Sequence, residues 1–426
     1  MAIELSNLTF TDQDDIVPAS GEDEILNTGI ANTLAGNDIL TGTPAGGLYS
    51  FSNSGTLNTG DGNDIITGTG SERRYSFFNS GTLNTGDGDD RISGTSQVTN
   101  SFSDGIVIRD GGIIDTGDGN DTITGTGYSN GISLENGQGT IDTGKGDDVI
   151  SGTILGPSGF GLYFSSNAFN IDTSVFNINT GEGNDVISGN TSGGVGMVTT
   201  VPIATGDGDD TITGTGNEVG FSCFSTLNTG DGNDIIAGSG SNLGINTNYQ
   251  TIYDDGNSIY IDGSNINTGD GNDTITGTTT SEGGYGIRNS FYEGIIDTGN
   301  GNDIIIGIGS IGIYNDGSIN TGDGKDSIIA DGGFGGSGNV FLGNGKDYLK
   351  GFGTGNFNGG NGKDTLELTS GSYTIGISGT AVNFTKNSII MNTSAFEELI
   401  AGGTTYNFSS LTEGQTIVVA YQCIWK

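Results

Sequence analysis

The chain has 426 residues, of which 83 are Gly and 4 are Pro, and hydrophobic residues make up only 31%. Glycine at this frequency, without a three-residue period, argues against an ordinary globular core and indicates tight turns that recur along the chain. Asp and Glu number 51 against 12 Lys and Arg, so the net charge is −39. This charge argues against nucleic acid and anionic membranes as partners, because both require basic surfaces.

The chain contains no His and two Cys, Cys223 and Cys423. The lack of His excludes imidazole-based triads and most zinc or copper sites. The two cysteines lie far apart in dissimilar contexts, so we expect each to be a small buried residue, with no disulfide framework or metal motif. No stretch approaches the roughly 18 apolar residues of a membrane span.

The first segment, residues 1–27, is expected to form an N-terminal cap. It begins MAIELSNLTFTDQDD, which has neither the basic region nor the apolar run of a cleaved signal peptide. Export, if it occurs, would therefore have to use another signal.

Residues 28–365 carry a repeated turn. The segment NTGDGNDIITG begins at Asn58 and returns as NTGDGDDRISG from Asn84 and DTGDGNDTITG from Asp115, with further copies as far as Asn358. The last Asp of the turn recurs from Asp38 to Asp364 with a mean spacing of (364 − 38)/12, about 27 residues, and a range of 17 to 39. The turn is therefore strictly specified, while the rest of each unit tolerates insertions.

Each unit also holds three short apolar runs: one directly after the turn, one in the middle and one before the next turn. Gly, Asn, Asp and Ser separate these runs, which is typical of strands joined by turns. Three short strands per unit predict an all-β fold, a right-handed parallel β-helix or solenoid, in which stacked coils share one inner core. Helix is expected to be minor, and residues 394–400 are the candidate segment for it.

The turn has the composition of a calcium site. Its glycines permit positive φ, so that carbonyl groups can converge, and its Asp adds a carboxylate oxygen with no nitrogen or sulfur donor nearby. Stacked carboxylates about 5 Å apart would repel by roughly 3 kcal/mol per pair at an effective dielectric constant near 20, and a divalent ion between coils would reverse this term. With one calcium-binding turn per coil and the ions in a row between successive coils, the predicted metal residues are Asp38, Gly60, Gly62, Asp64, Gly86, Gly88, Asp90, Gly117, Gly119, Asp121, Gly144, Gly146, Asp148, Gly181, Gly183, Asp185, Gly206, Gly208, Asp210, Gly230, Gly232, Asp234, Gly269, Gly271, Asp273, Gly299, Gly301, Asp303, Gly322, Gly324, Asp326, Gly343, Gly345, Asp347, Gly360, Gly362 and Asp364.

The alternative interpretation is a polar β-turn on a solvated edge, where Asn, Asp and Gly are common. Turn propensity alone would allow Asn, Ser or Gly at the final position of the motif. That position is Asp in every copy, which favours metal binding.

These residues resemble the RTX, or haemolysin-type, calcium-binding repeat of bacterial proteins, whose nonapeptide is G-G-x-G-x-D-x-U-x with U large and apolar. Gly60, Gly62, Asp64 and Ile66 match its second glycine, its next glycine, its aspartate and its U position. Two departures stand out. The first glycine is usually Thr, as in Thr59, and one turn serves a whole coil where the family's β-roll has two, so we expect a wider β-helix with calcium along a single edge.

The resemblance implies export by a type I machinery, through an uncleaved C-terminal signal, into calcium-rich surroundings where the chain folds. An acidic chain with few apolar residues lies near the boundary of disorder without its ion, which agrees with folding coupled to metal binding. Residues 366–426 lack the glycine turns and are β-rich. They are predicted to cap the solenoid and can also carry the export signal.

The sequence thus predicts a non-enzymatic, secreted or cell-surface protein with a structural or interaction role, and a cell-surface polysaccharide is a candidate partner. One alternative is a polysaccharide-active enzyme, a lyase or epimerase, on the same scaffold. Such an enzyme needs a basic side chain beside free carboxylates, and the candidates before the last coils are Arg73, Arg74, Arg91, Arg109, Lys145 and Arg288.

A second alternative is binding to ice or another crystal surface. Pairs of hydroxyl residues in T-G-T or S-G-T follow many turns and would form two files when stacked, although Thr also simply favours exposed strand positions. These pairs are Thr67 and Thr69, Ser93 and Thr95, Thr124 and Thr126, Ser151 and Thr153, Thr213 and Thr215, and Thr276 and Thr278.

Overall fold

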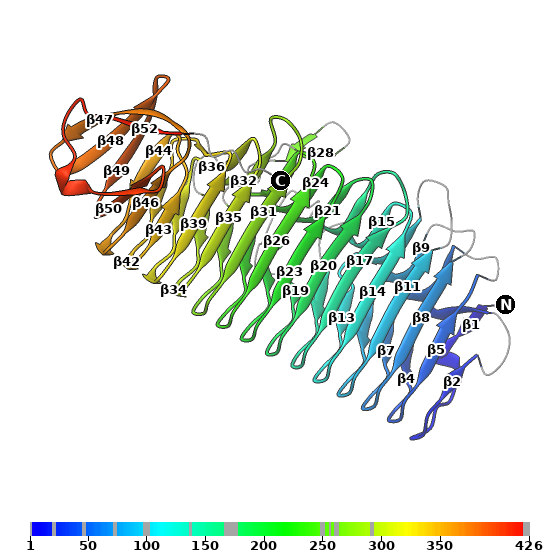
Figure 1. Cartoon of the computed structure of the whole chain (residues 1–426). Helices are drawn as coiled ribbons and strands as arrows, with labels where there is room; N and C mark the ends of the chain where they lie inside the picture. The colour runs from blue at the N-terminus through cyan, green and yellow to red at the C-terminus, as the bar shows by residue number, and fades with distance from the viewer. Residues whose placement is uncertain are drawn as a thin grey trace. The chain divides into compact units, whose positions relative to one another are not determined.

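The computed structural model describes residues 2–18, 23–44, 48–70, 75–96, 103–135, 139–165, 178–247, 252–254, 257–259, 264–289 and 294–420. Contacts within the chain define two compact units, Met1–Gly230 and Asp231–Lys426. Both units are built almost entirely of short β-strands (Figure 1).

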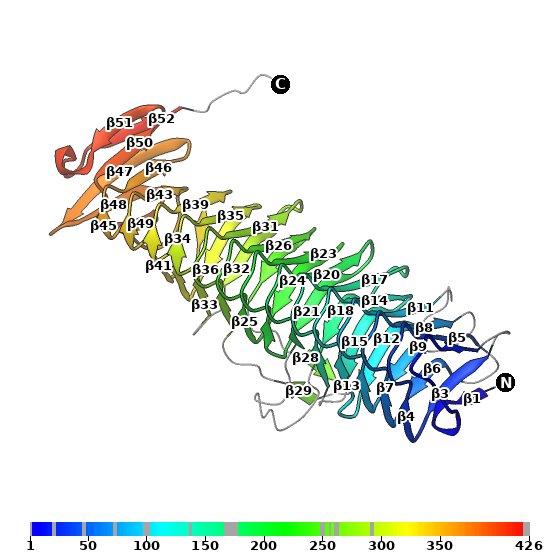
Figure 2. The ribbon, with the colours of Figure 1, turned by 90° about the horizontal axis from the view of Figure 1, so that it is seen from below.

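In the first unit, each coil adds one strand to each of three parallel sheets, which Figure 2 shows from below. Sheet A contains β1 (Ala2–Glu4), β3 (Glu24–Asn27), β6 (Tyr49–Asn53), β9 (Tyr75–Asn79), β12 (Asp104–Arg109), β15 (Asn130–Glu135), β18 (Phe160–Phe164), β21 (Val195–Thr199) and β24 (Val219–Cys223). Sheet B contains β2 (Ile16–Val17), β5 (Ile39–Gly42), β8 (Ile65–Gly70), β11 (Arg91–Ser96), β14 (Thr122–Gly127), β17 (Val149–Ile154), β20 (Val186–Thr191) and β23 (Thr211–Thr215). Sheet C contains β4 (Ile30–Asn32), β7 (Thr56–Asn58), β10 (Thr82–Asn84), β13 (Ile113–Asp115), β16 (Thr140–Asp142), β19 (Ile178–Asn179), β22 (Ile203–Ala204) and β25 (Thr226–Asn228).

The core of this unit consists of apolar columns, because in-register strands place equivalent residues above one another. In sheet B, Ile123 pairs with Ile150 and Ile150 with Ile187, and all three are fully buried. The outward residues between them are polar or half-exposed. The structure therefore confirms the predicted all-β solenoid with three faces.

The second unit repeats this arrangement. Its sheet A contains β27 (Leu243–Asn246), β32 (Tyr285–Asn289), β36 (Ile311–Asn315) and β40 (Phe334–Gly335). Its sheet B contains β26 (Ile235–Gly240), β31 (Thr274–Thr279), β35 (Ile304–Ile308), β39 (Ser327–Asp331), β43 (Tyr348–Lys350), β46 (Thr365–Leu368) and β50 (Glu398–Ala401). Its sheet C contains β30 (Asn265–Asn267), β33 (Ile295–Asp297), β37 (Ser318–Asn320), β41 (Asn339–Phe341), β44 (Gly355–Asn358) and β49 (Ile389–Ser394). A short fourth sheet runs along the turns, through β34 (Asn300–Gly301), β38 (Asp323–Gly324), β42 (Asn344–Gly345) and β45 (Asn361–Gly362), and β28 (Ile252–Asp254) pairs with β29 (Asn257–Ile259) in an antiparallel hairpin.

Beyond Gly371 the pairing becomes largely antiparallel. Strand β47 (Gly371–Ser378) pairs with β48 (Ala381–Lys386) and β52 (Thr416–Val419), β48 pairs with β49, and β51 (Thr404–Asn407) pairs with β50. Two of these strands still extend the solenoid, since β49 is parallel to β44 and β50 is parallel to β46.

The expected helix at residues 394–400 is wrong. Ser394 ends β49, and Leu399 lies in β50, buried and in register with Leu366. Strand alternation here uses the same apolar residues that suggested a helical period. The helical elements in the described ranges are two single 3-10 turns, η1 (Leu5–Asn7) and η2 (Phe408–Ser410), and these ranges contain no helix long and apolar enough to span a membrane.

The column packing predicts that Ile150→Ala destabilises the first unit by about 2–5 kcal/mol, because it removes a fully buried side chain between two others. Val149→Ala on the outward face of the same strand is the matched control and should cost less than about 1 kcal/mol. Thermal unfolding of both variants checks this. Equal losses would contradict the inward assignment of Ile150.

Candidate metal centre

The Gly-Asp turns join sheet C of one coil to sheet B of the next and follow one another along one edge of each unit (Figure 1). The first unit carries seven of the predicted aspartates, from Asp38 to Asp210, and the second carries six, from Asp234 to Asp364. All thirteen are at most 2% exposed, even though they lie in turns. In each unit, the structure therefore brings the predicted aspartates into one buried column.

One carboxylate oxygen of each aspartate holds the neighbouring coil. The backbone N–H of Asp64 donates to Oδ1 of Asp90 at 2.7 Å, and the N–H of Asp90 donates to Oδ1 of Asp121 at 2.8 Å. The same bond recurs in the second unit as far as Asp347, whose N–H donates to Oδ1 of Asp364 at 2.9 Å. This ladder was not predicted from the sequence, and it satisfies one buried donor in each of these coils.

The other oxygen, Oδ2, is buried without a hydrogen-bond partner in most of these turns. In Asp273 it accepts from the Thr268 hydroxyl at 2.6 Å. The Oδ2 atoms that have no partner in the described structure belong to Asp38, Asp64, Asp90, Asp121, Asp148, Asp185, Asp303, Asp326, Asp347 and Asp364. Because buried polar atoms are almost always paired, a repeated orphan oxygen indicates that a ligand completes it.

The threonine at the place where the RTX repeat has its first glycine contributes a second buried ladder. The Thr59 hydroxyl lies beside the Asp64 carboxylate and offsets part of the rise in its pKa that burial causes. In the structure this hydroxyl donates its single proton to the Thr85 carbonyl at 3.3 Å, which leaves Oδ2 of Asp64 without a donor. Sequence reasoning treated this threonine as a departure from the consensus. The recurrence of Thr at this one position of the turn is the sequence signal for the hydroxyl ladder.

Burial raises the pKa of most of these carboxyl groups. Burial, with a smaller contribution from the neighbouring aspartate charge, raises the pKa of Asp64 to about 6 and those of Asp90 and Asp121 to about 7. In the second unit, burial likewise raises the pKa of Asp347 to about 7. A stack of buried carboxylates without a cation is thus electrostatically unfavourable near neutral pH.

The turn glycines are required by both conformation and space. In the turns from Gly60 onward the first glycine has φ between 75° and 95°, a region that side-chain-bearing residues rarely adopt, and in the Asp38 turn Leu34 stands at this place with φ 77°. A Cβ at Gly86 would lie 2.2 Å from the carbonyl oxygen of Gly60 in the coil before it. These positions therefore bring the backbones and carbonyl groups of successive turns close together.

The residue before the buried aspartate forms a third ladder on the solvent side in the coils that carry Asn or Asp at this position. The N–H of Asn63 donates to Oδ1 of Asn37 at 2.7 Å, and the N–H of Asp89 donates to Oδ1 of Asn63 at 3.0 Å. These bonds run toward the preceding coil, whereas the bonds of the buried aspartates run toward the following one. Each pair of turns is therefore tied in both directions.

The donors around the column are carboxylate and carbonyl oxygens, a set that suits a hard divalent cation. No three acidic or Cys side chains meet at one point in the parts of the chain that the structure describes. A metal here would need aspartates of adjacent coils together with backbone carbonyls of the turns.

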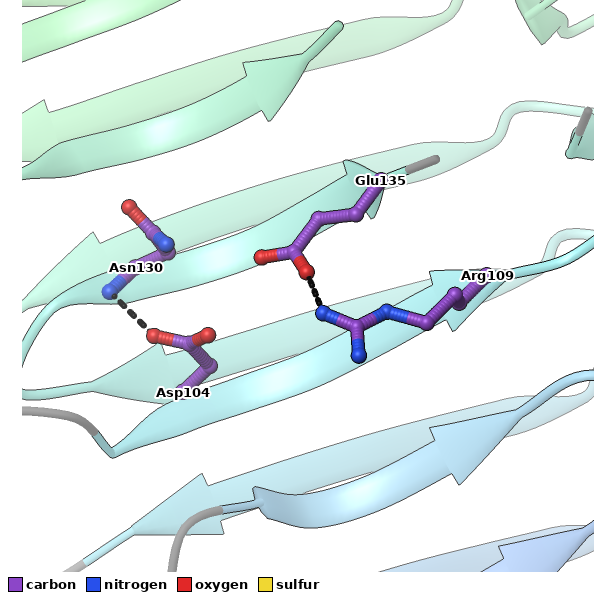
Figure 3. A network of polar contacts seen from close by, with 4 residues as sticks. All are labelled: Asp104, Arg109, Asn130 and Glu135. Atoms are coloured by element: carbon purple, nitrogen blue, oxygen red, sulfur yellow. Dashed lines mark hydrogen bonds and ion pairs between the residues drawn. The ribbon is translucent and has the colours of Figure 1, made fainter. Parts of the chain in front are cut away.

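The basic residues considered for a catalytic groove are mostly engaged. Figure 3 shows Arg109 paired with Glu135, and Oδ1 of Asp104 accepting from the Asn130 N–H at 2.9 Å. Burial, followed by the charge of Glu135, raises the pKa of Asp104 to about 7. Elsewhere, Lys145 pairs with Glu182 at 3.0 Å, Arg288 lies over the rings of Tyr285 and Tyr314, and Arg91 is exposed, while Arg73 and Arg74 lie outside the described residues.

The raised pKa values predict how the metal-free protein depends on pH. A carboxyl group whose pKa rises from 3.8 to 6 or 7 on folding stabilises the fold when protonated, and this stability is lost as pH rises through 6 and 7. In EGTA, the midpoint of thermal unfolding should therefore rise when pH is lowered from 8 to 5. A midpoint that falls over this range would contradict the buried column.

No family model matches this chain, and no curated protein does. A search of solved structures finds a calcium-dependent, β-helical, hyperactive antifreeze protein from an Antarctic bacterium. The match has 17% identity and a TM-score of 0.38 and covers 95% of this chain and 93% of that one. A likeness at this level assigns neither family nor function.

Proposed function

We propose that this chain is a calcium-binding protein with a structural or interaction role, in which calcium ions held between successive Gly-Asp turns stabilise the coils. The observation that carries this proposal is the column of buried aspartate Oδ2 atoms without hydrogen-bond partners. The aspartates of adjacent coils and the carbonyls of the turn glycines would hold the ions. Calcium fits better than zinc because the donors are all oxygens and the chain has no His.

Electrostatics gives the ions a role in folding. Adjacent rungs of a parallel sheet are about 4.8 Å apart, so two ionised aspartates at that distance repel by roughly 3 kcal/mol at an effective dielectric constant near 20. Divalent ions between the rungs turn this repulsion into attraction. We infer that the folded chain is much more stable where calcium is abundant.

This dependence supports a place outside the cell, either in the medium or on the cell surface. Cytosolic calcium is too scarce to fill sites of moderate affinity, whereas extracellular calcium binds modules with dissociation constants of roughly 10⁻⁴–10⁻³ M. Export by a type I machinery through a C-terminal signal remains a proposal, which rests on the RTX resemblance of the repeats. On this basis we propose a non-enzymatic role, such as that of an adhesin or a surface-layer component.

The enzyme alternative finds limited support in the Asp104, Arg109 and Glu135 network. Arg109 is already neutralised by Glu135, and Asp104 is 6% exposed, so neither is free to meet a substrate. A polysaccharide-active enzyme is therefore the less favoured proposal.

Binding to an ice or crystal surface is a second candidate, and one observation favours it. The predicted hydroxyl pairs do stack on sheet B of the first unit: Thr67 pairs with Ser93 and Thr69 with Thr95, and Ser93 and Thr95 pair in turn with the next coil. In the second unit Thr276 and Thr278 instead stack against Ile306 and Ile308. Regular hydroxyls on a flat face would present a lattice only in the first unit.

Asp90→Asn tests the calcium proposal, because it keeps an acceptor for the Asp64 N–H but removes the charge. With calcium, the variant should unfold about 5 °C lower, since one ligand is lost. In EGTA at pH 8 it should unfold higher than the parent, because a buried like charge is gone. Asp87→Asn, an exposed change in the same turn, is the control and should leave both midpoints within about 1 °C.

These midpoints are read from circular dichroism during heating. The proposal fails if Asp90→Asn shifts both midpoints in the same direction, or if the parent unfolds at the same temperature in calcium and in EGTA.

Thermal hysteresis of the calcium-loaded protein tests the second candidate. If this candidate is correct, ice growth is arrested below the melting point, and Thr126→Tyr in the middle of the hydroxyl file reduces the hysteresis several-fold. Freezing without any hysteresis excludes ice as the ligand.

A further inference from the structure

The last turns of the second unit present a row of lysines to solvent. Lys325, Lys346 and Lys363 each precede a buried aspartate, at the position that Asn302 occupies in the coil before. The N–H of Lys325 still donates to Oδ1 of Asn302 at 3.0 Å. A lysine side chain cannot accept a hydrogen bond from the next coil. The backbone N–H of Lys346 therefore donates to the Gly324 carbonyl at 3.4 Å, and that of Lys363 donates to the Gly345 carbonyl at 3.1 Å. The ladder of backbone N–H to side-chain oxygen bonds therefore ends at Lys325.

These coils carry less negative charge on their solvent side than the rest of the chain. Residues 318–368 contain four lysines and six acids, in a protein whose net charge is −39. Three of the acids, Asp326, Asp347 and Asp364, are buried in the proposed metal column. The solvent side of these coils therefore carries four lysines against three acids.

A groove of about 690 Å³ runs beside the lysine row. Its floor is one outward column of sheet B, in which Ile304 pairs with Ser327, Ser327 with Tyr348, and Tyr348 with Thr365. The groove crosses several coils. Its polar lining includes hydroxyl groups, the three lysine ammonium groups, the Asn302 amide and the Glu398 carboxylate. The Tyr348 hydroxyl donates to Glu367 at 2.6 Å and so meets a ligand as an acceptor.

The ammonium groups of two of these lysines are available to an anionic ligand. Lys363 pairs with Glu398, with Nζ and Oε1 2.5 Å apart. Lys325 and Lys346 are exposed and make no ion pair with any residue that the structure describes. Adjacent ammonium groups without counter-ions repel each other, and an anionic ligand along the row would relieve this repulsion.

We propose that this groove binds an acidic polysaccharide, whose carboxylate or sulfate groups meet Lys325, Lys346 and Lys363 and whose ring hydroxyls meet the column of Ser327, Tyr348 and Thr365. This inference names a ligand class for the interaction role proposed above and rests on that role. An extended acidic peptide fits less well, because its same-side residues repeat at about 6.8 Å whereas the rungs are about 4.8 Å apart. The acidic remainder of the chain disfavours nucleic acid.

The test measures binding of the full, calcium-loaded chain to immobilised dextran sulfate, with unmodified dextran as the neutral match. We expect binding to dextran sulfate only, weakened by salt. The triple variant Lys325→Gln, Lys346→Gln, Lys363→Gln should lose about tenfold in affinity, as expected for three surface ion pairs of modest strength. Lys145→Gln, an exposed lysine of the first unit, is the matched control and should bind like the parent.

Circular dichroism of the same samples separates the two proposals. If calcium does not change the unfolding midpoint but the triple variant still loses binding, the calcium proposal fails and the groove stands. The groove assignment is overturned if the folded parent ignores dextran sulfate, if the triple variant binds as the parent does, or if vesicles of phosphatidylcholine and phosphatidylserine in equal parts bind as well as the polysaccharide.

Discussion

The structure depends on one electrostatic constraint: a column of carboxylates is buried where like charges stack. One oxygen of each carboxylate is bound to the backbone of the adjacent coil, and the other is left without a partner in most turns. The first oxygen fixes the register between coils. The second oxygen has no hydrogen-bond donor, and a cation between coils can bind it. The stacking geometry and the proposed metal binding therefore depend on the same side chain.

This constraint explains why the coils vary so much in length. Successive buried aspartates are separated by 39 residues between Asp234 and Asp273 and by 17 between Asp347 and Asp364, yet both pairs keep their N–H to Oδ1 bond within 2.8 to 2.9 Å. The turn sets the position of each coil, and sheets A, B and C then follow in register. Extra residues leave the stack without disturbing it, as in the hairpin of β28 and β29.

Much of the fold could be predicted from the sequence because one short motif recurs in phase and every copy precedes an apolar run. The predicted aspartates of each unit, for example Asp64 and Asp90, lie in one column. The role of Thr59 and its equivalents could not be derived from composition, since a hydroxyl ladder depends on backbone placement.

The prediction for residues 394–400 was wrong because Leu399 and its neighbours fit a helical and a strand period equally well over so short a stretch. The lysine groove was invisible for a different reason: it joins three coils whose residues are far apart in the sequence.

Calcium stoichiometry tests the central claim most directly. Equilibrium dialysis of the full chain against millimolar calcium, followed by metal analysis, counts the bound ions. One ion between each pair of neighbouring buried aspartates predicts six ions in the first unit, from seven aspartates, and five in the second, from six. Binding of no more than one or two ions, or of none, would contradict the account.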